Sequence, residues 1–350
     1  LRYLEDVNNM FEEGVYRSTL SCGNLAHSFA GCGPSDKSEL AGNSTKNLGL
    51  VTAYNDMLSA HRVYENYPEE LRIYARKNNA VLQVAGGVPA MCDGVTQGKD
   101  GMELSLFSRD VIALSTSIGL SHNVFDAVLS LGICDKIVPG LMMGCLNYGH
   151  LPVVFVPGGP MPTGISNEEK AKIRQDFAEG KIDREALLKG ESDSYHSPGT
   201  CTFYGTANSN QMLMEAMGLH IPGSAFVHPH DNVRKLLTEE SVRQIIQNIE
   251  DPNMVPIGEL VDERVIINAM AALSVPPVFN TLIVWSAPVV ACNLIALAIS
   301  PSADISIPPA LASILIAVAD VPFEFVIVIV SLLSVFAVNA TAPSVFIVNV

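Results

Sequence analysis

The sequence predicts an α/β fold: a three-layer sandwich around a mainly parallel sheet, followed by an aberrant apolar tail. Over the first 270 residues, short apolar segments alternate with helical segments of about 10–15 residues, which is typical of βαβ units. The apolar segments run into turns rich in Gly, Pro and Asp, where strands are expected to end. From residue 271 onward the composition changes abruptly, which predicts a second and atypical region.

Each expected element follows from a stretch of the first 270 residues, in chain order. Strands running into turns are expected in "GLVTAYNDML" (49–58), "AVLQVAGGVPAMCDG" (80–94), "AVLSLGICDKIVPG" (127–140) and "LPVVFVPGGPMP" (151–162). Helices are expected in "YPEELRIYARKNN" (67–79), "SRDVIALSTSIGLSH" (108–122) and "LMMGCLNYGH" (141–150). The charged stretch 167–196 is expected to be a helical insertion that presents a solvated face.

Residues 271–350 differ from the rest because they contain no Gly, Lys or Arg. Their acidic residues are Asp304, Asp320 and Glu324, and Val, Ile, Ala, Leu and Pro dominate. A glycine-free stretch of this length is improbable for a folded enzyme that has turns to make. The preferred interpretation is a tail that is not the natural continuation of residues 1–270, for example through a shifted reading frame. A membrane segment and a β-rich apolar domain are the alternatives.

Charge and cysteine usage narrow the class of protein. The formal net charge of −15 argues against nucleic acid or an anionic membrane as a partner, leaving the apolar tail as the one route to a membrane. The seven cysteines are scattered and odd in number, and no signal peptide is recognisable, so reduced thiols in the cytoplasm are expected. Because the chain begins at Leu1 and not at Met, we expect an internal piece of a longer protein, incomplete at both ends.

Three segments combine Cys or Asp with Gly or Pro at expected strand ends: 87–110, 134–140 and 197–218. In parallel sheets, ligands gather at the carboxyl ends of strands. Thiolates favour iron–sulfur clusters, whereas carboxylates favour hard cations such as Mg²⁺. A site with both suits removal of water from a hydroxy acid: Mg²⁺ would stabilise the enediolate, and an iron with an open position would act as Lewis acid on the leaving hydroxyl.

The same segments carry a resemblance to a known family. "NLGLVTAYNDMLSAHRVYE", "QVAGGVPAMCDGVTQGKDGMELSLFSRDVIALS", "GLSHNVFDAVLSLGICDKIVPG" and "SYHSPGTCTFYGTANSNQM" resemble the dihydroxy-acid and 6-phosphogluconate dehydratase family, over about residues 18–270. "NDMLSAH", "DGMELSL" and "GTCTFYGTANSNQ" are more similar to the phosphogluconate branch. The resemblance implies a hydro-lyase that converts 6-phospho-D-gluconate to 2-dehydro-3-deoxy-6-phosphogluconate in the Entner–Doudoroff pathway. It also implies a phosphorylated sugar acid as the small-molecule partner, and a homodimer for the intact enzyme.

The resemblance also implies roles for particular residues. Cys134 and Cys201 match the family's iron–sulfur ligands, with a 4Fe-4S cluster implied by the phosphogluconate branch and 2Fe-2S as the alternative. Asp93, Asp135 and Lys136 match positions that hold Mg²⁺ in relatives, where the lysine is carbamylated. Cys92 neighbours these residues but is not assigned as a ligand.

Two departures from the family pattern bear on activity. Relatives with a two-iron cluster take a third Cys from the segment that matches "NDMLSAH", where this chain offers His61 and no Cys. After "VIINAMAAL" the chain also lacks the expected continuation and the later serine that acts as catalytic base, so the catalytic residue is unknown. We therefore expect cluster binding without turnover by this chain alone. The alternatives are another sugar-acid or dihydroxy-acid dehydratase, and a non-catalytic, membrane-associated product.

Overall fold

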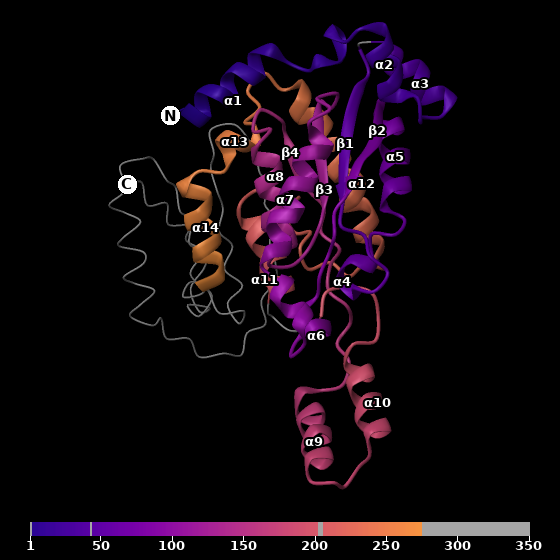
Figure 1. Cartoon of the computed structure of the whole chain (residues 1–350), viewed down its shortest axis with the longest axis vertical. Coiled ribbons are helices and arrows are strands. Elements are labelled where there is room, and N and C mark those ends of the chain that lie inside the picture. The colour runs from indigo at the N-terminus through magenta and orange to yellow at the C-terminus, as the bar shows by residue number, and fades with distance from the viewer. Residues whose placement is uncertain (1, 43, 202–205, 275–350) are drawn as a thin grey trace, which may run out of the picture. The chain divides into compact units, whose positions relative to one another are not determined.

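A parallel sheet forms the centre of the computed structural model, which describes residues 2–42, 44–201 and 206–274 (Figure 1). Within these residues the strands are arranged in the order β2-β1-β3-β4, and every pairing is parallel. The strands are β1 (Lys46–Thr52), β2 (Ala80–Gly87), β3 (Ala127–Leu131) and β4 (Val153–Phe155). The predicted parallel sheet is therefore confirmed.

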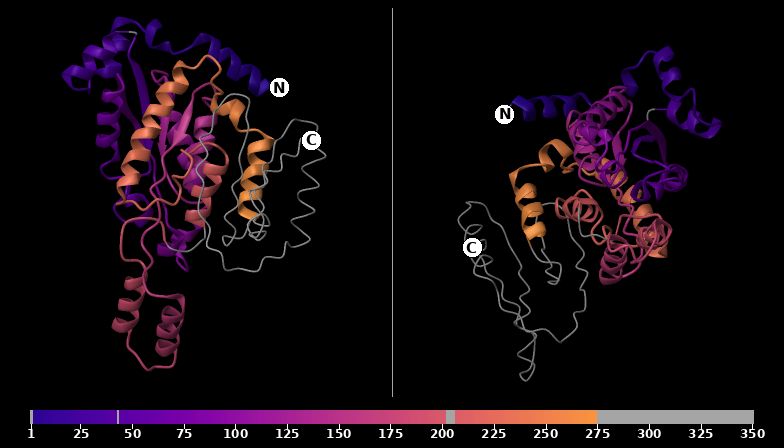
Figure 2. Two further views of the ribbon diagram at one scale, coloured as in Figure 1. Left: turned by 180° about the vertical axis from the view of Figure 1, so that it is seen from behind. Right: turned by 60° about the horizontal axis from the view of Figure 1, so that its bottom comes forward.

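The strands are apolar along their length because the sheet is buried on both faces. Leu50 and Val51 are neighbours in β1, are at most 1% exposed, and belong to opposite hydrophobic clusters. One cluster includes side chains of the helices α7 (Phe107–Leu120), α8 (Ile137–Leu146) and α11 (Thr206–Ala216). The other includes side chains of α5 (Tyr67–Lys77) and α12 (Asn232–Glu250), which crosses in front of the sheet in the left view of Figure 2. These two helical layers and the sheet make the predicted three-layer sandwich.

The remaining helical elements flank the two covering layers or lie within connections. At the N-terminus they are α1 (Arg2–Glu13), η1 (Tyr16–Thr19), α2 (Cys22–Phe29) and α3 (Pro34–Ala41). After the first two strands come α4 (Ser59–Arg62), α6 (Asp93–Thr96) and η2 (Asp100–Leu104). Further along the chain are α9 (Asn167–Ala178), α10 (Arg184–Ser194), α13 (Ile257–Leu260) and α14 (Glu263–Ser274).

The strand order creates a switch point between β1 and β3. The chain leaves β1 towards β2 on one side and leaves β3 towards β4 on the other, with α5 and α8 on opposite faces. Loops that diverge in this way open a crevice at the carboxyl ends of the strands, where ligands bind in open α/β sheets. The segment 53–61 and the segment 132–136 leave the sheet at this point.

Helices α9 and α10 form a hairpin that projects away from the sheet (Figure 1). Ser166 begins α9 with a capping box: its hydroxyl accepts from the Glu169 backbone N–H, and the Glu169 carboxylate accepts from the Ser166 N–H. At the base of the hairpin, Pro160 and Thr200 form an isolated parallel bridge. The charged insertion predicted over 167–196 is thus two helices that start and finish at one place.

The start of α8 differs from the expectation. The segment 137–140 was predicted to be a turn, with the helix beginning at residue 141, but α8 begins at Ile137. Pro139 therefore lies in the first turn of the helix, where the missing N–H would have no partner in any case. The consequence is that Lys136 lies directly at the N-terminus of α8, as its capping residue.

Close packing of α7 against α8 depends on glycine, and Gly144→Ala is expected to destabilise the fold. A Cβ at Gly144 would lie 2.4 Å from Thr116 Cβ and 2.8 Å from the Ala113 carbonyl oxygen. Alanine favours a helix by about 1 kcal/mol over glycine, yet we expect a net loss of about 1–3 kcal/mol from overpacking. Urea unfolding followed by circular dichroism measures it. Gly31→Ala, where nothing lies within 4 Å, is the control; equal changes would contradict the packing argument.

The described residues end close to the point where the apolar tail begins. Residues 1–273 form one compact unit, whereas the apolar tail falls almost entirely outside the described residues. The boundary near residue 270 and the origin of the tail remain predictions. No helix in the described ranges is long and apolar enough to cross a bilayer.

Candidate functional site

Lys136 brings together the residues that were expected to hold a metal ion. Its Nζ atom lies 2.9 Å from Oδ1 of Asp93 and 3.0 Å from Oδ1 of Asp135. The lysine is 1% exposed, whereas both carboxylates are about one-third exposed, at 36% and 34%. The segments after β2 and β3 therefore meet at the carboxyl edge of the sheet, with two carboxylates turned toward one buried cation.

The ion pairs control the protonation of these groups. Burial alone would raise the pKa of Asp93, but the hydrogen bond from Ser105 and the ion pair with Lys136 outweigh it and lower this pKa. Burial alone would lower the pKa of Lys136, but its hydrogen bonds to Asp93 and Asp135 raise it. At neutral pH the charged Lys136 ammonium therefore pairs with the ionised Asp93 carboxylate.

Ser105 is a site residue that the sequence reasoning missed. It is 3% exposed, and its hydroxyl donates to Oδ1 of Asp93 at 2.6 Å. It directly follows η2. The chain folds back between residues 93 and 105, so that Ser105 contacts an aspartate twelve positions earlier in the sequence. A single serine at this spacing gives no recognisable pattern, so only the folded chain reveals the contact.

Cys134 lies next to these residues in a strained backbone conformation. Its φ of +87° falls in the left-handed region that non-glycine residues adopt at a cost of about 1–3 kcal/mol, often at functional sites. Its Sγ atom lies 3.4 Å from Oδ1 of Asp135 and 3.7 Å from the hydroxyl of Thr206, at the start of α11. Burial raises the pKa of the Cys134 thiol to about 11.

Cys201 is positioned by the segment that precedes the hairpin. The N–H of Thr200 donates to the Gly159 carbonyl, and the Thr200 carbonyl accepts from the Met161 N–H, both at 3.0 Å. The Asn208 side-chain amide donates to the Cys201 carbonyl at 2.7 Å. The pKa of the Cys201 thiol is raised by burial and, to a smaller extent, by the charge of Cys92.

His61 lies at the same edge and positions a loop. It is 2% exposed, and its Nε2 atom accepts a hydrogen bond from the Ile133 N–H at 3.2 Å, directly before Cys134. Burial lowers the pKa of His61 to about 4, so the ring is neutral at pH 7. His61 therefore ties the segment after β1 to the segment after β3 across the switch point.

The arrangement fits both expected inorganic groups in its donor chemistry. Within the described residues, no three Cys, His, Asp or Glu side chains lie close enough to hold a single metal ion on their own. Mg²⁺ commonly binds one or two protein carboxylates and completes its coordination with water and substrate. Asp93 and Asp135 supply two such carboxylates. A polynuclear cluster spreads its cysteine ligands further apart than a single ion does, and Cys134 and Cys201 are both free thiols at this edge.

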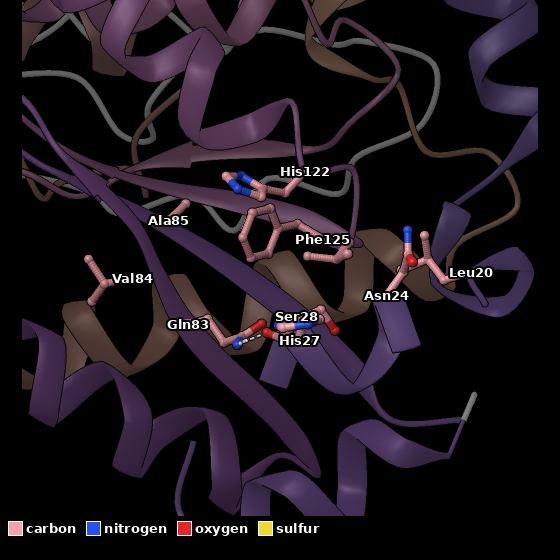
Figure 3. A pocket seen from close by; sticks show the side chains of 10 residues that line it. Leu20, Asn24, His27, Ser28, Gln83, Val84, Ala85, His122 and Phe125 are labelled. Carbon is pink, nitrogen blue, oxygen red and sulfur yellow. Dashed lines mark hydrogen bonds between the residues drawn. The ribbon is translucent and has the colours of Figure 1, made fainter. Parts of the chain in front are cut away.

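A pocket elsewhere in the molecule contains none of the predicted site residues (Figure 3). It has a volume of about 650 Å³ and lies between α2, the edge strand β2 and the residues before β3. In Figure 3, Gln83 donates to the backbone of Ser28 on one wall, with His122 and Phe125 on the other. The site chemistry at the strand ends and this pocket are separate features.

Comparison with known sequences decides the family. The sequence pattern of the dihydroxy-acid/6-phosphogluconate dehydratase N-terminal domain matches residues 46–276, which is more than half of the chain. The chain belongs to this dehydratase family. The match begins with β1 and contains the predicted cluster and metal residues, so the site at the strand ends lies within the family domain.

Curated members of the dehydratase family include close relatives. Phosphogluconate dehydratase of Pseudomonas aeruginosa is 60% identical over 273 residues, and that of Escherichia coli strain K12 is 58% identical over 272 residues. These matches cover 78% and 77% of the chain, and 45% of each relative. The dihydroxy-acid dehydratase of Sulfurimonas denitrificans is 32% identical over 236 residues, covering 63% of the chain and 41% of that relative. The chain thus spans about half the length of the curated relatives it matches.

Proposed function

We propose that this chain is part of a hydro-lyase that dehydrates 6-phospho-D-gluconate to 2-dehydro-3-deoxy-6-phospho-D-gluconate, a step of the Entner–Doudoroff pathway. The observation that carries the proposal is the buried Lys136 held between Asp93 and Asp135, beside Cys134, in a chain 55–60% identical to phosphogluconate dehydratases of several bacteria. A cytoplasmic location and a homodimer of the intact enzyme belong to the same proposal.

The proposed roles follow from donor chemistry. Asp93 and Asp135 would hold Mg²⁺ through carboxylate oxygens, and Cys134 and Cys201 would hold an iron–sulfur cluster of the 4Fe-4S type, with 2Fe-2S as the alternative. When bound, the two groups supply Lewis-acid stabilisation of the enediolate and of the leaving hydroxyl. The carboxylates are about one-third exposed, whereas Ile133 and His61 beside them are buried.

Lys136 is proposed to change its chemical state when the metal site is formed. As an ammonium it neutralises the two carboxylates, and its raised pKa keeps it charged. A divalent cation bound to the same carboxylates would repel the ammonium and favour the neutral amine. The neutral amine can then add carbon dioxide, forming an N–C bond and releasing a proton, which gives a carbamate and thus a third oxygen donor.

The test uses a chimera, because the chain matches about half of its relatives' length. Residues 1–273 of this chain replace the matching part of E. coli phosphogluconate dehydratase, and the chimera is purified without oxygen. We expect formation of the 2-dehydro-3-deoxy product from 6-phosphogluconate, and little turnover of gluconate, which lacks the phosphate. Cys134→Ser in the same chimera should abolish both the iron chromophore and the turnover.

A matched chimera joins residues 1–273 to the remaining part of the S. denitrificans dihydroxy-acid dehydratase. That relative is only 32% identical to this chain. We therefore expect the second chimera not to turn over dihydroxy acids. Activity of this second chimera on a dihydroxy acid, together with a folded but inactive first chimera, would favour the dihydroxy-acid branch and contradict the proposal.

A further inference from the structure

Three of the cysteines in the described residues, and not two, lie at the carboxyl edge of the sheet. Cys134 follows β3, Cys201 follows the hairpin base, and Cys92 lies between β2 and α6, directly before Asp93. All three are free thiols of intermediate exposure. The third of them has no role in the site described above.

Contacts connect the segment of Cys134 to the segments of both other cysteines. The segment of Cys134 reaches that of Cys92 through the 2.9 Å ion pair between Lys136 and Asp93. The segment of Cys134 also reaches that of Cys201, because its Sγ atom lies 3.7 Å from the Thr206 hydroxyl, five residues after Cys201. The segment of Cys134 thus lies between the segments of the other two cysteines and contacts both.

The other cysteines of the described ranges are held elsewhere. Cys145 is fully buried in the α7–α8 face of the core and pairs with Ser130, while Cys32 accepts a hydrogen bond from Gln83 beside the edge strand. Cys22 is exposed in the first turn of α2. His61, the other candidate for a third ligand, is buried with Nε2 bonded to the Ile133 N–H. Among the described cysteines, Cys92 is therefore the remaining thiol at the same edge as Cys134 and Cys201.

We propose that Cys92 is a third protein ligand of the iron–sulfur cluster, together with Cys134 and Cys201. This inference rests on the proposed function, since it adds a ligand to the cluster proposed there. Three cysteines satisfy all but one position of a cluster that usually takes four, which leaves one iron without a protein ligand. The neighbouring Asp93 then couples the cluster to the metal site, because a shift of the backbone at Cys92 moves the Asp93 carboxylate relative to Lys136.

The alternative role for Cys92 is an ordinary thiol in the connection before α6. In that case it would have little influence on iron binding, and it would react with alkylating reagents whether or not a cluster is present. A ligand behaves differently, because a sulfur bound to iron is unavailable to such reagents and its loss changes the electronic environment of the cluster.

The experiment reconstitutes the 350-residue chain with ferrous iron and sulfide without oxygen. Iron, acid-labile sulfide and the electron paramagnetic resonance spectrum of the reduced protein are measured for the wild type, Cys92→Ser, Cys134→Ser and Cys32→Ser. Iodoacetamide labelling with mass spectrometry then reports which cysteines the cluster protects in the wild type, a readout that needs no variant and no enzyme activity.

We expect Cys92, Cys134 and Cys201 to be protected from iodoacetamide in the loaded wild-type chain and labelled after the iron is removed. Cys92→Ser should lose most of its iron or show a changed resonance spectrum, as Cys134→Ser does, while Cys32→Ser should match the wild type. Labelling of Cys92 in the loaded wild type, with an unchanged spectrum in Cys92→Ser, would overturn the inference and leave the proposed function intact. A folded wild-type chain that takes up no cluster would overturn both.

Discussion

Lys136→Met is expected to cost the protein stability and to abolish most of the activity of the chimera described above. Methionine keeps the volume of the side chain but removes the charge, so Asp93 and Asp135 lose their shared cation. Removal of one partner from a buried pair costs about 3–5 kcal/mol, and since these carboxylates are one-third exposed we expect about 2 kcal/mol. Turnover should fall roughly 10²–10³-fold, as when other preorganised charged groups are removed.

The pH dependence of this loss has a defined sign. The pKa of Asp93 is lowered in the folded chain, so its contribution is present above the usual aspartate pKa and is lost as the pH falls through the lowered value. The raised pKa of Lys136 makes its contribution present below the usual lysine pKa and lost as the pH rises through the raised value. The stability difference should therefore be largest between about pH 4 and pH 10.

Lys189→Met is the matched control for this substitution. Lys189 is 76% exposed and pairs with Asp193 on the surface of α10, so its loss should change stability by less than about 0.5 kcal/mol. Guanidinium unfolding at pH 7 measures both variants. If Lys136→Met were as stable as Lys189→Met and the chimera kept its turnover, the ion pairs would have no part in the site.

Gly159→Ala is expected to be the most destabilising single-methyl substitution near the site. Gly159 has a φ of +87°, and an added Cβ would lie 1.9 Å from the Val227 carbonyl oxygen and 2.9 Å from Nη2 of Arg234. Left-handed backbone costs alanine about 1–2 kcal/mol, and overpacking against a fixed carbonyl adds about 1–3 kcal/mol. We therefore expect a total loss of about 3 kcal/mol, measured by urea unfolding.

Two further contacts make Gly159 difficult to move. Its N–H donates to the side chain of Gln211 at 3.0 Å, and its carbonyl accepts from the N–H of Thr200, next to Cys201. Arg234, which is 1% exposed, holds the opposing carbonyls of Ser224 and Val227 in place from behind. Any relaxation of the alanine variant should therefore displace the Cys201 segment and reduce iron uptake as well.

Gly180→Ala separates the two causes of this destabilisation. Gly180 has a similar φ of +73°, but nothing lies within 4 Å of the position that its Cβ would take. We expect a loss of about 1–2 kcal/mol from the backbone alone, with unchanged iron uptake. If both variants lost the same free energy of unfolding, the contact with Val227 would add nothing to the destabilisation caused by the backbone at Gly159.

The sheet could be predicted because strands buried on both faces leave long apolar stretches in the sequence. The meeting of Asp93 with Asp135 and Lys136 follows from the same pattern, since the carboxyl ends of parallel strands lie at one edge. Ser105 could not be predicted, because its position depends on the path of the short helical turns between β2 and α7. The buried Arg234 was also missed, since arginine in a polar helix normally faces water.

The α9–α10 hairpin is closed at its base by the Pro160–Thr200 bridge and by the approach of Gly164 to the Asp193 carbonyl. An excursion closed at its base can be lengthened or shortened without transmitting the change to the residues beyond its stem, and the entropy of a longer loop grows only with the logarithm of its length. The hairpin is therefore a modular appendage of the domain. Its length can change without moving the strand ends, and a reporter group attached at its tip would sample the solvent while Cys201 keeps its place.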